Sequence, residues 1–564
     1  MRTRLRPLLA AGALAVTLAL VFGVGGAFSS TDDVEQLRKI QEAYGLIANQ
    51  YVERVDSAQL AEDAIEGMLG GLDPHSIYIS SEEMRSVRES FDATFDGIGI
   101  YFEFVEGAAD RDTLVVLMPI AGGPSEEAGL EAGDRIVGID DTTAVGFDTE
   151  LVQRYLKGPK GTRVKVTVKR PGFREPLSFT ITRDRIPLET VIATYMLDDD
   201  TGYIKLQRFA RTSRDEVRAA IGELKRQGME RLVLDLRDNG GGLMDQAVFI
   251  ADEFLEAGEL SLYTEGRVPG SSRRYVATSG GSFEDGPLMV LVNENSASSS
   301  EIVAGAVQDH DRGLIVGRRS FGKGLVQQQF PLRDGSVMQM TVSRYYTPAG
   351  RLIQTPYTIG AGEEAYIVAK RELREAFEGL TPVGGEIVET SRLGGSLPDS
   401  LKFETAGGRT VYGGGGILPD FIVPFDTIPP AARTMYGKGL DNAFARELVA
   451  TDGDALRARF DGPAAIARPG ARLPDGTFER FLVFAERQGV ETVDAVPVDS
   501  LRESVFVRDE LPEARDLIET RIRAFVGRRL FGMDAFYPTV AAVDPVLTRL
   551  PELWDRAVSL AAAN

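Results

Sequence analysis

Four serines lie close together in the segment NENSASSSE, directly after the apolar run PLMVLV. They are Ser296, Ser298, Ser299 and Ser300. The pattern predicts a strand followed by a helix, with the serines at the helix N-terminus. There, free backbone N–H groups and the positive end of the helix dipole can stabilise an oxyanion. Serine is also a common helix cap, so the cluster alone admits a structural role as well as a nucleophile.

A lysine suited to act as a base follows 25 residues after Ser298. In the segment RRSFGKGLVQQQF, Lys323 lies between two glycines in a strand-rich region. Burial disfavours the ammonium form and lowers a lysine pKa towards the range of a general base. A Ser-Lys dyad needs no histidine. The chain has only two histidines, His75 in LDPHS and His310 in a polar helix-end pattern that predicts exposure; neither is excluded as a base.

The same segment is a near miss to a phosphate-binding loop. GRRSFGKG matches the pattern G-x-x-x-x-G-K-[ST] except at its last position, where Gly324 lacks the hydroxyl that would bind magnesium. A phosphate loop also needs a helix after the lysine, whereas LVQQQFPL reads as a strand. Nucleotide binding is therefore disfavoured.

A glycine-rich turn ends another apolar strand. In LDLRDNGGG, Gly240, Gly241 and Gly242 follow the run that contains Asp235. The open N–H groups of such a turn can form the other half of an oxyanion hole. A glycine turn that merely leaves a strand is the plainer alternative.

Residues 93–172 resemble a PDZ domain of the circularly permuted bacterial kind. Gly97, Ile98, Gly99 and Ile100 match its carboxylate-binding loop, and AGLEAGDRIVGID matches the turn and strand that follow. Successive N–H groups in such a loop can hold a terminal carboxylate, while the next strand edge accepts a peptide as an added strand.

The remaining sequence divides into further regions. Residues 1–30 combine Arg2, Arg4 and Arg6 with an apolar run over 8–28, typical of an export signal or a retained membrane anchor. Residues 31–92 read as a helical cap. Residues 173–430 alternate strands and helices, which predicts a mainly parallel α/β sheet. Residues 431–564 read as an amphipathic helical domain with one long helical stretch, ELPEARDLIETRIRAFVGRRLFGMDAFYPTV.

The bulk composition narrows the classes of function. The 564 residues are 43% hydrophobic and carry a net charge of −21, which indicates a globular protein and argues against a nucleic-acid partner. Cysteine is absent, so disulfides, a thiolate nucleophile and cysteine-ligated zinc are excluded.

Together these motifs resemble the carboxyl-terminal processing (tail-specific) peptidases over roughly residues 40–425. The resemblance implies an α/β multidomain fold with a ClpP- or crotonase-like core, Ser298 as nucleophile and Lys323 as general base. It further implies that Gln327 orients the lysine and that Gly241 and Ser299 supply the oxyanion N–H groups. The chain departs from the family pattern at Ser299, where alanine is usual, and at Gly240, where many members have proline; the latter leaves the choice between Gly241 and Gly242 open.

The resemblance also implies a function. The expected protein is an exported serine endopeptidase that cleaves proteins near or from their C-termini. It would be periplasmic or anchored to the outer face of the inner membrane through residues 8–28. It would need no metal or cofactor and would recognise substrates with free C-termini through its PDZ domain. An activating adaptor and self-association through the helical regions are further expected partners. The alternative is a non-catalytic PDZ adaptor with a peptidase-like domain.

Overall fold

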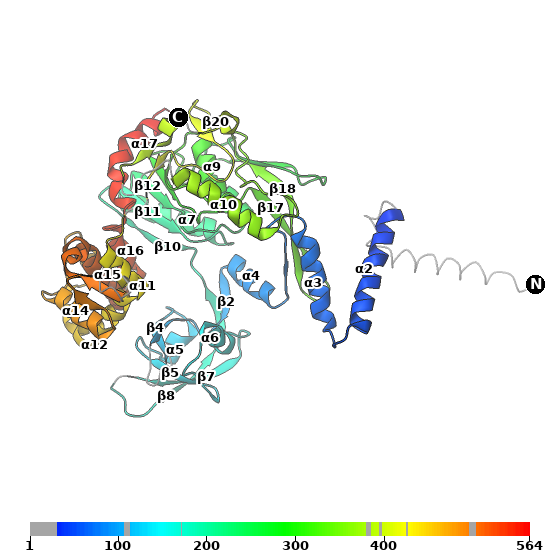
Figure 1. Ribbon diagram of the computed structural model, residues 1–564. Helices are drawn as coiled ribbons and strands as arrows, with labels where there is room; N and C mark the ends of the chain where they lie inside the picture. Colours follow the sequence, from blue (N-terminus) through cyan, green and yellow to red (C-terminus); the bar gives the residue numbers. More distant parts are fainter. Residues whose placement is uncertain are drawn as a thin grey trace, which may run out of the picture.

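The computed structural model describes residues 31–105, 113–170, 172–378, 385–393, 397–424, 427–495 and 504–563. The expected signal or anchor, residues 1–30, lies outside the described residues. Figure 1 shows a central α/β body, with the PDZ sheet and the C-terminal helices beside it and the N-terminal helices α2 (Thr31–Gln50) and α3 (Ser57–Gly70) to one side. None of the described helices has the length and apolar character to span a bilayer.

The central body contains a seven-stranded sheet that positions the serine cluster. Its middle strands run parallel, and both edge strands are antiparallel to their neighbours. The strand order is β10 (Val191–Met196), β11 (Thr201–Leu206), β12 (Arg231–Asp235), β15 (Leu288–Val292), β16 (Leu314–Gly317), β22 (Phe421–Ile422) and β19 (Val388–Glu389). Because β12 and β15 are parallel neighbours, the turns after both strands meet at one sheet edge.

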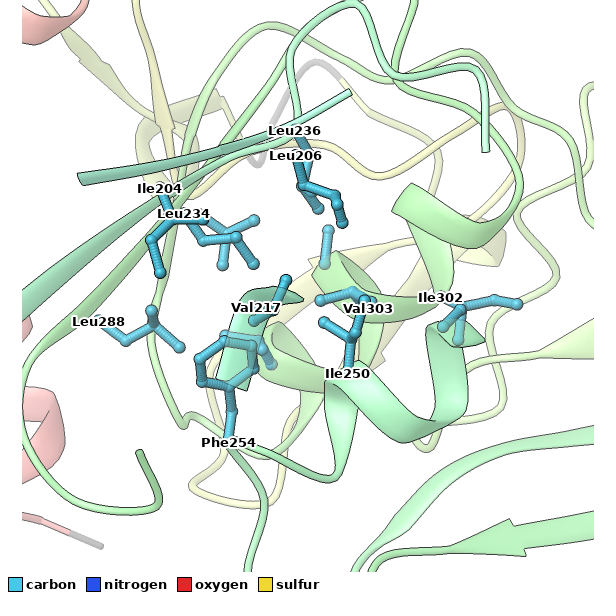
Figure 2. Packing of buried hydrophobic residues seen from close by; sticks show 14 of the residues in the cluster. Ile204, Leu206, Val217, Leu234, Leu236, Ile250, Phe254, Leu288, Ile302 and Val303 are labelled. Atoms are coloured by element: carbon cyan, nitrogen blue, oxygen red, sulfur yellow. The ribbon is translucent and has the colours of Figure 1, made fainter. Parts of the chain in front are cut away.

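Three helices bury one face of this sheet. They are α7 (Ser213–Arg226), α8 (Met244–Ala251) and α9 (Ser299–Asp309). Figure 2 shows Val303 of α9 beside Ile250 of α8; Ile302, Phe254, Leu234 and Leu288 belong to the same cluster. All five residues of β15 are buried, as expected of a parallel strand covered on both faces. This packing fixes α9, and with it the serine cluster.

A second sheet carries the lysine segment. Its path is β1 (Ile77–Ile79), β18 (Val337–Tyr346), β13 (Leu260–Glu265) and β14 (Arg273–Val276), and β17 (Leu325–Pro331) also pairs with β18. Lys323 precedes β17, and the LDPHS segment precedes β1. Between β18 and β22 the chain also forms α10 (Gly362–Glu378), the 3-10 turns Thr390–Leu393 and Asp399–Leu401, and the hairpin of β20 (Lys402–Glu404) and β21 (Thr410–Tyr412).

The PDZ region is a sheet of six strands that extends past the predicted end at residue 172. The strands are β3 (Ile100–Val105), β4 (Thr113–Pro119), β5 (Arg135–Ile139), β6 (Thr142–Thr143), β7 (Arg163–Lys169) and β8 (Leu177–Thr182), with helices α5 (Pro124–Ala128) and α6 (Thr149–Leu156). Strand β8 pairs with β7 and buries Ile181, so it completes the same core. Helix α4 (Glu83–Asp92) and the pair β2 (Thr94–Gly97) and β9 (Asp184–Pro187) join this region to the central body.

The C-terminal helices have an aromatic core of their own, in which Phe444 contacts Phe481 and Phe484. The elements are α11 (Pro430–Gly437), α12 (Leu440–Arg459), α13 (Pro463–Ala467), α14 (Thr477–Arg487), β23 (Glu491–Val493), β24 (Val505–Val507), the 3-10 turn Arg508–Glu510, α15 (Leu511–Phe531) and α16 (Met533–Ala541). The stretch predicted as one long helix breaks at Gly532, whose φ of 82° ends α15.

The last residues do not belong to this helical core. The 3-10 turn η5 (Leu547–Leu553) and α17 (Trp554–Ala561) pack Leu547, Leu550 and Trp554 against the central sheet instead. The predicted helical domain 431–564 therefore divides, because the apolar side chains after residue 545 find their burial on the α/β body.

Candidate active site

Ser298 differs from the three serines around it. Ser296 donates its hydroxyl to Leu236 O at 2.8 Å, Ser300 to Asn239 O at 2.8 Å and Ser299 to Gly242 O at 3.1 Å. These three hydroxyls tie the turn to the strand and are structural. Among the hydrogen bonds of the described residues, none uses Ser298 Oγ as a donor. Its hydroxyl proton is therefore available for transfer.

The backbone at Ser298 is strained. Its φ of 53° and ψ of −110° lie outside the favoured regions for a residue with a side chain. Such strain persists only where surrounding contacts enforce it, and it concentrates at functional sites. Here it turns the chain sharply from β15 into α9 and leaves Ser298 at the helix N-terminus.

The buried carboxylate of Glu301 holds the serine turn against the lysine segment. It accepts the N–H groups of Ser298 at 2.8 Å, Lys323 at 2.9 Å and Gly322 at 2.7 Å. It also accepts the Ser320 hydroxyl at 2.6 Å. Burial raises the pKa of Glu301 to about 7, although these four donors favour the ionised form. One side chain thus fixes the backbones of both Ser298 and Lys323.

A tyrosine makes a second bridge between the same two residues. The buried Tyr345 hydroxyl lies 2.6 Å from Lys323 O and 3.2 Å from Ser298 O, with the shorter contact as the stronger hydrogen bond. Burial raises the pKa of Tyr345 well above its usual value, so the hydroxyl stays protonated as a donor. The two backbones are therefore held together from two sides.

The side chain of Lys323 is held in position by Gln327. Lys323 Nζ donates to Gln327 Oε1 at 2.8 Å, and Gln339 donates to the same oxygen at 3.2 Å. The amide nitrogen of Gln327 donates to His75 O, which fixes the orientation of the amide. Burial lowers the pKa of Lys323, against the opposing effect of Glu301 and Asp73. Within the described residues, no hydrogen bond joins Lys323 Nζ to Ser298 Oγ in this arrangement.

The glycine turn lies against the serines, but its N–H groups differ in availability. A Cβ at Gly241 would meet Ser298 Cβ at 2.9 Å and Ser299 N at 3.0 Å, so only glycine permits this approach. Gly241 N–H is already donated to Asn239 Oδ1 at 2.9 Å. Among the described residues, we find no acceptor for the N–H groups of Gly242 and Ser299. These two are the donors that the present geometry leaves open.

Two residues of this site, Glu301 and Tyr345, have no distinctive signal in the sequence. His75 is open as a base from the sequence, within the helical cap 31–92. The structure places His75 beside the lysine: its carbonyl holds Gln327, and burial together with Lys323 lowers its pKa to about 4. Asp73 could have been predicted, because Asp-Pro-His-Ser is typical of an Asx turn; its carboxylate accepts the N–H groups of His75 and Ser76.

His310 was expected to be exposed, but its side chain is only 14% exposed and contacts Leu260 O.

The PDZ loop has the features expected of a carboxylate site. Gly99 adopts a φ of 73°, and the loop folds back so that Ile98 O accepts from Ser125 N and Oγ at 3.0 and 2.7 Å. No acceptor for the N–H groups of Ile98 and Gly99 occurs within the described part of the chain. Strand β3, which begins at Ile100, forms the edge of its sheet and can accept an added strand.

No group of three or more metal-ligating side chains occurs among the described residues. The chemistry available at this site is that of a serine hydroxyl, a buried amine and backbone donors.

Comparison with known proteins matches three stretches of the chain to families. Residues 200–360 match peptidase family S41, residues 115–170 match the PDZ domain and residues 25–83 match the N-terminal domain of the activating protease CtpB. A carboxy-terminal-processing protease of Bartonella bacilliformis is 36% identical over 382 residues, which covers 67% of this chain and 84% of the relative.

Two further relatives are similar over shorter spans. Carboxy-terminal processing protease CtpB of Bacillus subtilis is 36% identical over 56% of this chain and 65% of its own length. The solved structure of a photosystem II D1 C-terminal processing protease is 32% identical, covers 58% of this chain and 84% of its own, and superposes with a TM-score of 0.32.

We predict that Gln327→Glu raises the pKa of Lys323. The new carboxylate would lie where Gln327 Oε1 now lies, 2.8 Å from Nζ, and an opposite charge at that distance favours the ammonium by about 1–3 pKa units. Acetylation of Lys323 as a function of pH, followed by mass spectrometry, reports the neutral amine. Its midpoint should move to higher pH. Gln328→Glu, on the exposed neighbour, is the matched control and should leave the midpoint in place; equal midpoints in both variants would contradict the assignment of Gln327.

Proposed function

This chain belongs to peptidase family S41 and is a carboxy-terminal processing serine peptidase, and we propose that it uses Ser298 as its nucleophile and Lys323 as its general base. The observation that carries the proposal is the double bridge of Glu301 and Tyr345, which fixes these two residues side by side. The free proton donor of Ser298 and the lowered pKa of Lys323 supply the chemistry.

The proposed reaction proceeds through an acyl-enzyme. Neutral Lys323 takes the proton of Ser298 Oγ as the oxygen attacks the scissile carbonyl, and the resulting ammonium donates that proton to the leaving amine. Water then attacks the ester, again with Lys323 as base, and the serine is released. Gln327 keeps the amine at a fixed position between these steps.

The oxyanion of each tetrahedral intermediate needs donors beside Ser298. We assign this role to Ser299 N–H and the glycine turn, which contact each other through Ser299 Oγ and Gly242 O. In the turn, Gly242 N–H is open, whereas Gly241 N–H can serve only if Asn239 releases it. Donors fixed before the reaction stabilise the developing charge without reorganisation.

Recognition of the substrate tail is assigned to the PDZ loop. The N–H groups of Ile98 and Gly99 would hold the terminal carboxylate, and the β3 edge would pair with the peptide backbone. Support for the location of the protein comes from sequence alone: Arg2, Arg4, Arg6 and the apolar run 8–28 favour export, with the peptidase outside the cytoplasm and the run either removed or retained as an anchor.

The nucleophile is tested by cleavage of casein, an unstructured protein, with residues 31–564 and the Ser298→Ala and Lys323→Ala variants. Each substitution should lower turnover by at least about a thousandfold, because the dyad acts as a unit. The exposed residues Ser272 and Lys225 supply matched alanine controls that should cleave like the parent.

The outcomes separate the classes of function. If folded Ser298→Ala protein cleaves casein as fast as the parent, this contradicts the assignment of Ser298 as the nucleophile. Absence of cleavage by the parent, even with peptides that carry free apolar C-termini, would favour a PDZ adaptor without peptidase activity.

Peptide binding tests the PDZ loop separately from catalysis. A peptide with an apolar residue and a free carboxylate at its C-terminus should bind Ser298→Ala protein, and its C-terminal amide should bind at least about tenfold more weakly. Gly99→Val should abolish the difference, since a Cβ at this position meets Ile186 at 3.0 Å and φ is positive. Gly146→Ala, a positive-φ glycine elsewhere in the domain, controls for general strain. Equal affinities for acid and amide would contradict carboxylate recognition.

Self-association is proposed for helix α2. Its apolar side chains Val34, Leu37, Ile40 and Ile47 recur at helical spacing, yet each is at least 40% exposed. A second copy of the same helix could cover this stripe. The double substitution Leu37→Glu, Ile40→Glu should lower the mass measured by light scattering towards that of one chain. Lys39→Glu, on the polar side of the helix, changes its charge by the same amount and should leave the measured mass unchanged. A parent protein that is already monomeric would refute the proposal.

A further inference from the structure

The segment after α16 reaches back to the glycine turn of the active site. Arg237 directly precedes this turn, and its guanidinium binds the Asp544 carboxylate in a two-point contact of 3.0 and 2.9 Å. The side chains are only 14% and 18% exposed. Asp544 lies far beyond residues 200–360, the stretch that matches the peptidase family. A part of the chain outside the matched stretch thus contacts Arg237, the residue that precedes the glycine turn.

The contact belongs to a buried cluster of charged side chains. On its inner side, Arg237 binds Asp235, which is fully buried and also accepts the Tyr203 hydroxyl at 2.6 Å. Lys205 lies 3.4 Å from Asp235 and 3.2 Å from Arg237 O. Arg237 thus has two carboxylate partners, Asp235 and Asp544, while Lys205 also interacts with the Asp238 carboxylate. Without Asp544 the nearly buried Arg237 guanidinium would lose one of its two partners, which is costly in a buried site.

The position of Arg237 is transmitted to the nucleophile through backbone contacts. The next residue, Asp238, donates its N–H to Asn293 Oδ1 at 2.9 Å and adopts a φ of 63°. Asn239 O then accepts Ala297 N at 3.0 Å and the Ser300 hydroxyl at 2.8 Å. These two acceptor contacts lie on either side of Ser298. A displacement of Arg237 therefore shifts the turn relative to the serine that it must serve.

Asp544 is itself fixed in place. Its Oδ1 accepts the N–H groups of Val546 at 2.9 Å and Leu547 at 3.1 Å and so caps the turn η5. That turn and α17 pack on the central sheet, where the Arg231 guanidinium lies 4.6 Å from the Trp554 ring. The carboxylate is thus presented to Arg237 by a rigid, packed segment rather than by a flexible tail.

We infer that Asp544 is a positioning residue for the peptidase reaction, acting through Arg237 on the oxyanion turn Asp238–Gly242. The effect on catalysis rests on the proposed function, whereas the effect of Asp544 on the order of the turn does not. The C-terminal part of the chain thereby acquires a defined role, because it supplies the charge that holds the oxyanion donors in register with Ser298.

Two measurements test this on the Asp544→Asn variant, which removes the charge but can keep the caps of η5. Hydrogen exchange should become faster at the amides of residues 238–242 and stay unchanged in β15. In the casein assay kcat should fall about 10- to 100-fold, less than for outright loss of an oxyanion donor, while KM changes less than twofold. Asp555→Asn, an exposed carboxylate on α17, is the control and should match the parent in both.

The results distinguish this inference from the function on which it rests. Unchanged exchange at residues 238–242 would overturn it whether or not the protein cleaves casein. With a parent that cleaves and a Ser298→Ala variant that does not, an unchanged kcat for Asp544→Asn would also overturn it. A fall in kcat that is matched by a lower Tm, and that Asp544→Glu does not partly restore, would mean a structural role only.

Discussion

A single buried carboxylate, that of Glu301, determines whether this site can exist. Its four donors come from two segments that the fold brings from different sheets, the start of α9 and the loop before β17. Without it, the N–H groups of Ser298, Gly322 and Lys323 would be buried without partners, which costs about 1–3 kcal/mol for each group. The distance between Ser298 and Lys323 is therefore set by backbone hydrogen bonds rather than by their flexible side chains.

The same carboxylate constrains the chemistry. An ionised Glu301 favours the ammonium form of Lys323, whereas burial favours the neutral amine. Because burial also raises the pKa of Glu301 to about 7, the carboxyl group is partly protonated near neutrality and its pull on the lysine is weakened there. As pH rises through 7 the carboxylate ionises and raises the Lys323 pKa, so the gain in neutral amine is slower than for an isolated buried lysine. The hydrogen bonds of Glu301 favour its ionised form, whereas a neutral Lys323 is favoured when Glu301 is protonated.

The sequence predicts the parts of this site that depend on local pattern. Strand, turn and helix around Ser298 and the glycine turn after Asp235 follow from apolar runs and glycines, and the alternation of strands and helices implies a parallel sheet that brings their ends together. The resemblance to a known family singles out Ser298 among four serines. The structure supplies an independent reason, since the other three hydroxyls bind backbone carbonyls.

What could not be predicted depends on contacts between distant segments. That Asn239 occupies Gly241 N–H is a matter of side-chain geometry, and that His75 O orients Gln327 joins residues 252 positions apart. The PDZ sheet continues into β8 because Ile181 completes its core, although the sequence places the end of the domain just after the alternating strand β7. Likewise, nothing in the amphipathic pattern after residue 545 shows that Trp554 packs on the α/β body.

Similar long-range contacts join the C-terminal part of the chain to both the PDZ sheet and the α/β body. Arg529 of α15 binds Glu103 on the PDZ strand β3 at 2.8 Å, with both side chains nearly buried, and Asn442 and Arg446 of α12 also contact this carboxylate. Fifteen residues later the same stretch of chain presents Asp544 to Arg237. Strand β3 and the glycine turn after β12 therefore both contact the stretch of chain from α15 to Asp544. Both contacts come from residues outside the two stretches that match the PDZ domain and the peptidase family, so neither stretch alone contains the partners of Glu103 and Arg237.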